Sequence, residues 1–561
     1  MTDHPFVAKA FQYVEDVLTG KELACRWVRL ACERHRRDLG ASEAGTFRWV
    51  FDPVKAERPC KVVELLPHTK GKWAANRQRI KLENWQCFII CSVFGWVDRE
   101  TGLRRFREVF TLVPRKNGKS ALSAAVGIYM LAYDNEMGAE VYCNATSEKQ
   151  ALEVFTPAKV MVSNSPNLIS AKGIKVNASN LNVADTHSKF EPVIGKPGDG
   201  SSPSFAIIDE YHEHAASDAH DTMLTGMGAR EQPILWVITT AGDNLAGPCY
   251  NRQITVQDIL AGAIDDDRSF GIIYTVDPDD DWTDPASLRK ANPNMGVSVG
   301  EEYLLDMQKR AITNPRDQGS FKTKHLNIWV NSRQAYFNSE SWAKCPKAPP
   351  LEDMRGRRCW LALDLASKVD LTALEMLFPL GDGHYARYGK IYLPEDTVDD
   401  PKNTHYHQWR EQGLIEVTGG NIVDYSYIEE DILELARRYE IADCSYDPFQ
   451  ATYVSTRLAA QGINMVEYRQ TVQTMSDPMK TLDSWILAGK LHHNCGVSDP
   501  MTWQIANVVS RTDRKDNVFP NKEQESKKID SPVALIMCVG RATLDTGPER
   551  SAYEDRGLLI I

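Results

Sequence analysis

The sequence predicts an α/β protein with two domains, each built on a β-sheet covered by helices. Three observations predict this class. Short apolar runs of strand length alternate with longer segments whose apolar residues recur at helical spacing, which favours mostly parallel sheets. The chain has 561 residues, too many for a single hydrophobic core. A polar stretch with several prolines, residues 339–358, separates two regions that both show the alternation.

These patterns divide the chain into five segments. The N-terminal segment carries apolar residues at helical spacing, and the last segment is rich in charge and glycine, as expected of a mobile tail. The predicted segments are N-terminal helices (1–58), a first α/β domain (59–335), a linker (336–358), a second α/β domain (359–545) and the tail (546–561).

Composition sets limits on function. Hydrophobic residues make up 42% of the chain and charged residues 25%, as in ordinary globular proteins. No run of eighteen apolar residues predicts a membrane span, and the start MTDHPFVAKA lacks a signal pattern, which indicates an intracellular protein. The twelve cysteines form no CxxC pair and are expected to be reduced core thiols. A net charge of -11 argues against a uniformly basic nucleic-acid binder but permits a local basic groove.

The segment LVPRKNGKS, residues 112–120, has the features of a phosphate-binding loop. An apolar strand is expected before it at Val109 to Val113, and an alanine-rich helix after it at Ser120 to Tyr133. In such a loop the glycine lets the backbone approach the phosphates, the lysine contacts the β and γ groups, and the hydroxyl binds Mg²⁺. The residues expected to contact the nucleotide are Arg115, Lys116, Asn117, Gly118, Lys119 and Ser120. The loop departs from GxxxxGK[ST] because valine and proline stand at its first positions.

A second motif, FAIIDE at residues 205–210, supplies the other half of a nucleotide site. It is an apolar strand that ends in two carboxylates. Asp209 is expected to hold Mg²⁺, and Glu210 to orient and deprotonate a water molecule. Each motif alone is also consistent with a core strand that runs into a polar loop. Together, in this order and spacing, they predict an ATPase.

Other residues are candidates for the same site. Thr239 and Thr240 end the apolar strand that begins at Ile234, where they could sense the γ-phosphate or form only a turn. Gln86, beside Trp85, could contact adenine, although a buried tryptophan is the ordinary alternative. Arg115 and Arg230 could stabilise transition-state charge, in cis or across a subunit boundary, or could form surface ion pairs.

The second domain carries acids at the ends of its elements. Asp364 lies on an apolar strand that begins at Trp360, Asp447 follows the strand Ile441 to Tyr446, and Asp530 begins an apolar helix. Three such acids can hold two divalent cations, Mg²⁺ or Mn²⁺, that clamp a phosphodiester. Asp370 is a weaker fourth candidate. Each acid alone could be only a helix cap or a turn residue, but the trio favours a metal-dependent nuclease of ribonuclease H-like type.

With these residues in place, the chain resembles the large terminase subunit of tailed bacteriophages. The resemblance covers nearly the whole chain and rests on motifs in a fixed order: VEDVLTGKELACRWVRLACERHRRDL, RKNGKS, NATSEKQA, IIDEYHEH, VITTAG, HLNIWVNS, LDLASKVDLTAL, YDPFQA and KIDSPVAL. It implies an N-terminal P-loop ATPase of the ASCE or RecA-like class and a C-terminal ribonuclease H-like nuclease. A loop without the first glycine is usual in this family.

The resemblance also implies residue roles and partners. Lys119 and Ser120 match the phosphate and Mg²⁺ ligands, Asp209 the second Mg²⁺ contact and Glu210 the catalytic base. Thr239 and Thr240 match the coupling motif, Gln86 the adenine-contact segment, and Asp364, Asp447 and Asp530 the nuclease acids; Arg230 is the chosen trans arginine. The implied partners are double-stranded DNA, a small terminase subunit, the portal protein, further copies of the chain in a ring, and an HNH endonuclease.

The implied function is a motor that hydrolyses ATP to move DNA into a prohead and that cuts concatemeric DNA. It would act in the host cytoplasm and transiently at the portal, and would be absent from the mature virion. Two alternatives remain open from the residues. A translocase or helicase without nuclease activity would need a second lobe that supplies arginines to ATP, and a portal-docking adaptor would need decayed sites.

Overall fold

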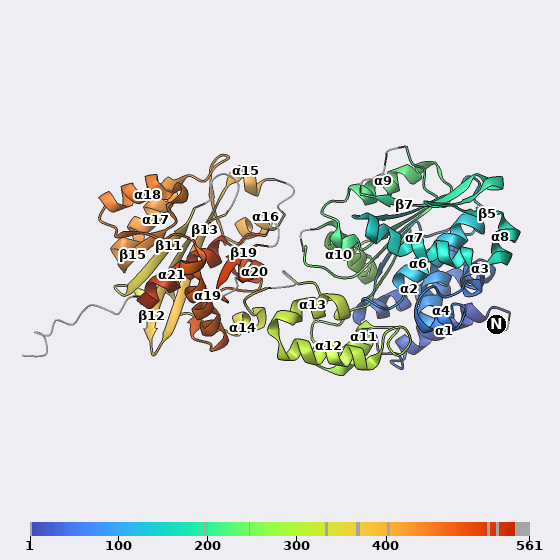
Figure 1. The fold of residues 1–561 in the computed structure, drawn as a ribbon, viewed down its shortest axis with the longest axis horizontal. Helices are drawn as coiled ribbons and strands as arrows, with labels where there is room; N and C mark the ends of the chain where they lie inside the picture. Colours follow the sequence, from blue (N-terminus) through green and yellow to red (C-terminus); the bar gives the residue numbers. More distant parts are fainter. Residues whose placement is uncertain are drawn as a thin grey trace, which may run out of the picture. The chain divides into compact units, whose positions relative to one another are not determined.

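The computed structural model describes residues 3–544 except for 196–197, 199, 246, 331–334, 366–370, 401–403, 513–515 and 523–526. The chain forms two compact units, Met1–Arg333 and Gln334–Ile561 (Figure 1). The predicted tail, residues 546–561, lies outside the described residues. Within the described part of the chain, no helix is both long and apolar enough to cross a membrane.

The first unit is built on an eight-stranded sheet with the order β10-β3-β9-β8-β4-β7-β6-β5. The pairs from β10 to β7 are parallel, whereas β6 and β5 add antiparallel pairs at one edge. The strands are β3 (Glu108–Leu112), β4 (Glu140–Ala145), β5 (Ile174–Val176), β6 (Leu181–Val183), β7 (Ser188–Ile194), β8 (Phe205–Asp209), β9 (Ile234–Thr239) and β10 (Ser269–Ile273). A separate hairpin pairs β1 (Trp49–Phe51) with β2 (Trp96–Asp98).

Helices surround this sheet, which explains why its central strands are apolar throughout. All residues of β8 and β9 are buried. The N-terminal helices pack into the same hydrophobic core as the sheet, so they belong to this unit. The helices are α1 (Pro5–Leu18), α2 (Arg26–Glu43), α3 (Pro53–Leu65), α4 (Gly71–Ala75), α5 (Asn84–Gly95), α6 (Lys119–Ala132), α7 (Glu148–Ser163), α8 (Pro166–Lys172), α9 (Asp218–Gly226), α10 (Pro248–Ala261), α11 (Pro285–Ala291), α12 (Glu301–Thr313) and α13 (Pro315–Leu326).

The strand order places the predicted motifs at one edge of the sheet. The strand before the phosphate loop, β3, pairs with β9, and β9 pairs with β8, which carries the two acids. An extra strand thus lies between the loop strand and the acid strand, as expected for the ASCE class. Because the three strands are parallel, their carboxyl ends lie side by side.

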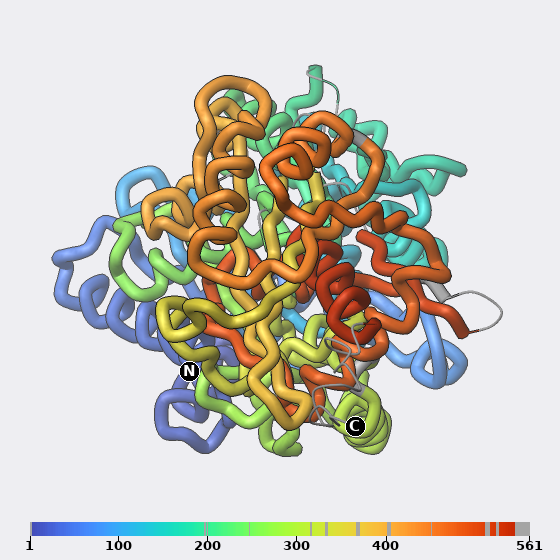
Figure 2. Tube along the Cα trace, turned by 90° about the vertical axis from the view of Figure 1, so that its left-hand side faces the viewer, coloured from blue at the N-terminus to red at the C-terminus, as the bar shows by residue number. Residues whose placement is uncertain are grey.

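The second unit is built on a mixed sheet with the order β14-β13-β12-β11-β15-β16, and β17 also pairs with β13. β12 pairs antiparallel with both β11 and β13, while β15 runs parallel to β11 and β16 runs parallel to β15. This is the ribonuclease H-like arrangement, and Figure 2 follows the same strands from another direction. The strands are β11 (Arg358–Asp364), β12 (Thr372–Gly381), β13 (His384–Pro394), β14 (Glu416–Thr418), β15 (Glu440–Tyr446), β16 (Met465–Glu467) and β17 (Leu491–His492), with β18 (Val509–Thr512) and β19 (Val518–Asn521) as a separate hairpin.

Helices pack on both faces of the second sheet, where they form separate cores. One core contains residues of α19 and α21, and the other contains residues of α17 and α18. The helices of this unit are α14 (Ser339–Ala343), α15 (Glu395–Val398), α16 (Thr404–Glu411), α17 (Tyr425–Arg438), α18 (Pro448–Ala460), α19 (Val472–Leu487), α20 (Pro500–Asn507) and α21 (Asp530–Leu544).

The prediction of a linker at residues 336–358 is wrong. Tyr336, Phe337 and Trp342 are buried in one core of the second unit, and Met354 is buried in the other. The prolines and polar residues of this segment suggested an exposed connection. Its interspersed large apolar side chains instead pack on the sheet, because burial of apolar surface stabilises the fold. The twelve cysteines are all free thiols, as predicted.

Candidate functional site

A cavity of about 590 Å³ opens at the carboxyl edge of the first sheet. It brings together the phosphate loop, the first turn of α6 and the two acids that end β8. Its lining includes Arg115, Lys116, Gly118, Lys119, Ser120, Asp209 and Glu210, with His68, Thr69, Lys70, Trp73, Ala121, Gln150, Glu153, Pro157 and Met161 on other sides. Seven residues predicted from sequence therefore meet in one cavity.

The phosphate loop owes its shape to two residues with left-handed backbone conformations. Gly118, the N-cap of α6, has φ +84°, and Lys116 has φ +71°. Glycine adopts this conformation without steric cost. The Lys119 side chain is buried, and its Nζ donates a hydrogen bond to the carbonyl oxygen of Val113 at 2.8 Å. Burial lowers the pKa of Lys119, while Glu210 and Asp209 oppose that shift. The ammonium group is thus desolvated and faces two carboxylates across the cavity.

The two acids differ in their electrostatic surroundings. Burial, reinforced by the charge of Glu210, raises the pKa of Asp209 to about 7. Burial acts in the same direction on Glu210, but Lys119 and a hydrogen bond from His212 outweigh it, so the pKa of Glu210 lies below its ordinary value. Glu210 also leaves the strand with φ +48°, which separates its side chain from that of Asp209. A bound cation would relieve the repulsion between the acids, so the donor set fits a divalent metal.

Arg115 contributes a group that fits an anionic ligand. Its side chain lines the cavity, and its Nε is buried with no hydrogen-bond partner among the described residues. The main-chain N–H of Arg115 donates to the carbonyl oxygen of Lys324 at 2.9 Å, which fixes the backbone. A buried guanidinium nitrogen without an acceptor is costly, and a phosphate oxygen in the cavity would supply one.

A histidine that the sequence analysis did not single out connects Glu210 to the predicted sensor residues. His212 lies 3.2 Å from Glu210 through Nδ1 and 3.0 Å from Glu213 through Nε2. Its main-chain N–H donates to Oγ1 of Thr239 at 3.1 Å, and Thr240 donates to Glu210 at 3.5 Å. Burial favours neutral His212, but the hydrogen bonds to the two glutamates outweigh it and raise its pKa. Thr239 and Thr240 therefore lie behind Glu210 and do not line the cavity.

Two asparagines from a segment distant in sequence support the phosphate loop through hydrogen bonds. Asn117 donates from Nδ2 to Oδ1 of Asn292 at 2.9 Å, and its Oδ1 accepts from the main-chain N–H of Asn294 at 3.0 Å. Asn294 donates to Ser298, which donates to the carbonyl oxygen of Lys116 at 2.6 Å. The predicted Asn117 thus supports the loop from inside the protein. No local pattern identifies Asn292 and Asn294, because they lie far from the loop in sequence.

Trp85 and Gln86, the segment predicted to contact adenine, do not line the cavity. Trp85 is buried, and its Nε1 donates to Oδ1 of Asn294 at 3.1 Å, as in the alternative of a buried tryptophan. Gln86 accepts from the main-chain N–H of Glu83 as part of a helix-capping pair and does not line the cavity. His68 and Trp73, whose ring centroids lie 4.8 Å apart, line it instead.

Arg230 lies at the opposite edge of the sheet, before the first residue of β9. It pairs with Glu136 at 3.0 Å and donates to the carbonyl oxygens of Ser202 and Gly138. The possibility that Arg230 acts in cis is therefore wrong, because the amino and carboxyl ends of a parallel strand lie on opposite edges. A role in the site of a neighbouring subunit stays a prediction.

In the second unit, the three predicted acids lie at the same edge of the sheet. Asp364 ends β11, Asp447 caps α18 directly after β15, and Asp530 begins α21. Burial, together with the charges of Asp530 and Asp447, raises the pKa of Asp364 to about 8. Burial likewise raises the pKa of Asp530 to about 6. Acids that repel one another in a buried setting fit a site for divalent cations.

Gln470 links two of these acids and was not predicted. Its Nε2 donates to Asp364 at 3.0 Å, and its main-chain N–H donates to Asp447 at 3.4 Å. Within the residues that the structure describes, no group of three or more acidic, histidine or cysteine side chains is already gathered around a metal position. Asp370 lies outside the described residues.

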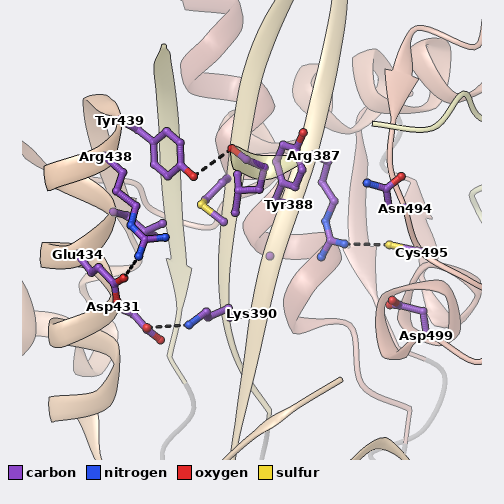
Figure 3. Close-up of a pocket in the computed structure, with 14 residues that line it drawn as sticks. Arg387, Tyr388, Lys390, Asp431, Glu434, Arg438, Tyr439, Asn494, Cys495 and Asp499 are labelled. Carbon is purple, nitrogen blue, oxygen red and sulfur yellow. Dashed lines mark hydrogen bonds and ion pairs between the residues drawn. The ribbon is translucent and has the colours of Figure 1, made fainter. Parts of the chain in front are cut away.

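A second cavity in this unit, about 330 Å³, contains none of the three acids. It lies over β13 and α17, and Figure 3 shows that several of the side chains that line it pair with one another. Lys390 contacts Asp431 at 2.7 Å, Arg438 pairs with Glu434, and Arg387 donates to Cys495 at 3.0 Å. We assign no catalytic role to this cavity.

The fold and the two sites define a P-loop ATPase joined to a ribonuclease H-like nuclease. Models of the terminase large subunit match the chain over both parts: the ATPase domain at residues 84–257 and the endonuclease domain at residues 263–545. The chain belongs to the terminase large subunit family. The family uses a nucleotide and divalent metal, and its members are ATPases and endonucleases of the DNA-packaging motor that cut concatemers.

Several known proteins are similar to this chain. Protein YmfN of Escherichia coli (strain K12) is 47% identical over 364 residues, which cover 62% of this chain and 79% of that protein. The terminase large subunit of Enterobacteria phage HK97 is 27% identical over 457 residues, which cover 79% of this chain and 88% of that protein. The crystal structure of the HK97 large terminase aligns with 87% of this chain and 99% of its own, at 25% identity and a TM-score of 0.43. The nuclease match removes the alternative of a translocase without nuclease activity.

Proposed function

We propose that ATP is bound and hydrolysed in the cavity at the edge of the first sheet. Lys119 and Arg115 would contact the phosphates, the loop from Lys116 to Ser120 would surround them, and Glu210 would accept a proton from the attacking water. Bound Mg²⁺, held by Ser120 and Asp209, would neutralise charge on the phosphates. The observation that carries this proposal is the meeting of a desolvated lysine, an unsatisfied arginine nitrogen and two acids in one cavity.

We propose that His212 couples hydrolysis to the rest of the domain. Its Nδ1 lies 3.2 Å from a carboxylate oxygen of Glu210 and 3.0 Å from Oγ1 of Thr239. A change in the charge or position of Glu210 during the reaction would therefore alter the hydrogen bonds of the strand end at Thr239 and Thr240. Such a change can shift a two-state arrangement of neighbouring segments.

We further propose that Asp364, Asp447 and Asp530 hold two divalent cations, Mg²⁺ or Mn²⁺, with Asp370 as an additional ligand. When bound, such a pair activates a water molecule and stabilises the leaving oxygen of a phosphodiester. The chain's own contribution is to orient the acids: Gln470 holds Asp364, and the N–H of Phe449 holds Asp447.

The specific partners are also proposals, which rest on family membership. We infer that several copies form a ring at the portal vertex, with Arg230 serving the site of a neighbour. A small terminase subunit would select the DNA, because phosphate contacts position DNA without specifying sequence. An HNH endonuclease would be a further partner. The protein would act in the host cytoplasm and at the portal, and would leave before the virion matures.

One experiment tests both sites. Purified protein is incubated with plasmid DNA and Mn²⁺, and ATP hydrolysis is measured in parallel. Glu210→Gln is expected to lose hydrolysis while it keeps cutting, and Asp364→Asn to lose cutting while it keeps hydrolysis. Cutting that survives Asp364→Asn would overturn the metal assignment, and hydrolysis that survives Glu210→Gln would overturn the assigned base.

A further inference from the structure

Exposed aromatic side chains gather on one part of the second unit. The structure describes four strongly exposed aromatic residues, and three of them, Tyr427, Phe449 and Tyr453, lie on α17 and α18. Phe449 is 77% exposed and Tyr453 63%. Large exposed apolar groups that cluster usually mark a binding surface.

This surface adjoins the proposed nuclease acids. Asp447 is the N-cap of α18, and its Oδ1 accepts a hydrogen bond from the main-chain N–H of Phe449 at 2.9 Å. Phe449 and Tyr453 are four residues apart on the helix, so they lie on the same face about one turn from each other. The exposed Phe449 side chain thus stands two residues after an acid of the proposed nuclease site.

The charge of α18 suits a polyanion. The helix sequence PFQATYVSTRLAA contains no acidic residue, although the chain as a whole has a net charge of -11. Its exposed positions include two threonines as well as Arg457. Arg457 donates from Nη1 to the hydroxyl of Tyr453 at 2.8 Å and pairs with Glu429 of α17 at 2.9 Å. These contacts hold Tyr453 in place beside a positive charge.

We propose that the face of α18 formed by Phe449 and Tyr453 binds the DNA substrate beside the scissile phosphodiester, with the Phe449 ring stacked on a base that is unstacked at the cut. The proposal rests on the proposed nuclease site. Aromatic side chains bind bases through their π-faces without reading sequence, and apolar wedges insert between base steps. A nuclease whose cleavage site is selected by a partner protein needs DNA contacts that do not depend on sequence.

The test measures DNA binding separately from cutting. In the Asp364→Asn background, a labelled duplex with a central mismatch is titrated by fluorescence anisotropy at fixed salt. Phe449→Ala is expected to raise Kd about tenfold, in line with the cost of losing one stacked base. Phe449→Trp should restore binding to within about twofold of the parent by the same stacking argument. The matched control is Leu487→Ala at the C-terminal end of another helix, α19, where Leu487 is 55% exposed.

The outcomes separate this inference from the proposed nuclease site. A Kd for Phe449→Ala equal to that of Leu487→Ala would overturn the stacking surface, whatever Asp364→Asn does to cutting. Weakened binding combined with cutting that survives Asp364→Asn would keep the surface and overturn the metal site. A Phe449→Ala variant that binds DNA normally but loses self-association in sedimentation would assign the surface to a protein partner and so contradict the proposal. Unchanged ATP hydrolysis and melting temperature establish that the variant is folded.

Discussion

Asn117 and Asn292, separated by 175 positions in the chain, are joined by a hydrogen bond of 2.9 Å beneath the phosphate loop. Both side chains are fully or almost fully buried. Asn292 also donates to the carbonyl oxygens of Leu288 and His325, so the loop is tied to the helices α11 and α13. The loop conformation that receives phosphates is thus maintained by a segment outside the strand-loop-helix motif.

Asn292→Ala is expected to weaken ATP binding more than it slows hydrolysis. The substitution removes one of the acceptors of Asn117 Nδ2 and both hydrogen bonds that Asn292 donates. It loosens the loop in the ground state and the transition state alike, so KM rises while kcat changes little. The rise should be roughly threefold to thirtyfold, from the cost of one unsatisfied buried group. Steady-state ATPase kinetics measure it, with Asn177→Ala as control, because Asn177 is exposed and bonds only to Asn180 and its neighbours. A fall in kcat at constant KM would contradict the positioning role.

His212 is expected to make stability depend on pH. Its pKa is raised above the ordinary 6.5 by Glu210 and Glu213, so its charged hydrogen bonds stabilise the fold fully below pH 6.5 and are lost as the pH rises through the raised value. Urea unfolding should therefore show that His212→Asn lowers the free energy of unfolding by about 1.5–3 kcal/mol at pH 6. The difference in free energy of unfolding between the parent protein and His212→Asn should decrease toward pH 9. The exposed His187, changed to Asn, serves as control, and a pH-independent difference would refute the charged state.

Gln470→Leu is expected to impair cutting and leave ATP hydrolysis intact. The hydrogen bond from Gln470 lowers the pKa of Asp364, which burial has raised to about 8. Without that bond the pKa rises further, and Asp364 stays protonated over more of the neutral range. Plasmid cleavage at pH 7 should fall about tenfold, the cost of a hydrogen bond to a charged group, and recover as the pH is raised above 8. An unchanged pH profile would show that Gln470 does not act through Asp364.

The pair Glu375 and Arg387 is expected to control the stability of the second unit. Both side chains are buried, and Nε of Arg387 lies 2.6 Å from Oε2 of Glu375. Glu375→Ala leaves an uncompensated guanidinium and should cost about 3–5 kcal/mol of unfolding free energy. The double variant Glu375→Leu with Arg387→Met should lose less, because no charge remains buried. Additive losses in the double variant would argue against a coupled pair.

Much of the fold was predictable because strands and helices are set by local patterns. The strand β8 and its acids appear in the sequence as four apolar residues followed by Asp209 and Glu210, and β3 and α6 flank a recognisable loop. The same reasoning located Asp364, Asp447 and Asp530 at element ends. This reasoning misjudged residues 336–358, where prolines suggested a linker but Trp342 is buried in the core. It also allowed Arg230 to act in the site of its own subunit, because the position of Arg230 depends on the direction in which its strand runs.

The sequence by itself indicated the proposed chemistry of both sites, because the candidate groups stand in short motifs at the ends of strands or at the first turns of helices. Only the tertiary structure decided which groups support them. The supporting groups act through hydrogen bonds that form when segments distant in sequence pack together; they are His212, Asn292 and Gln470. A hydrogen bond reaches only about 3 Å, so its partners are chosen by how the chain folds back on itself.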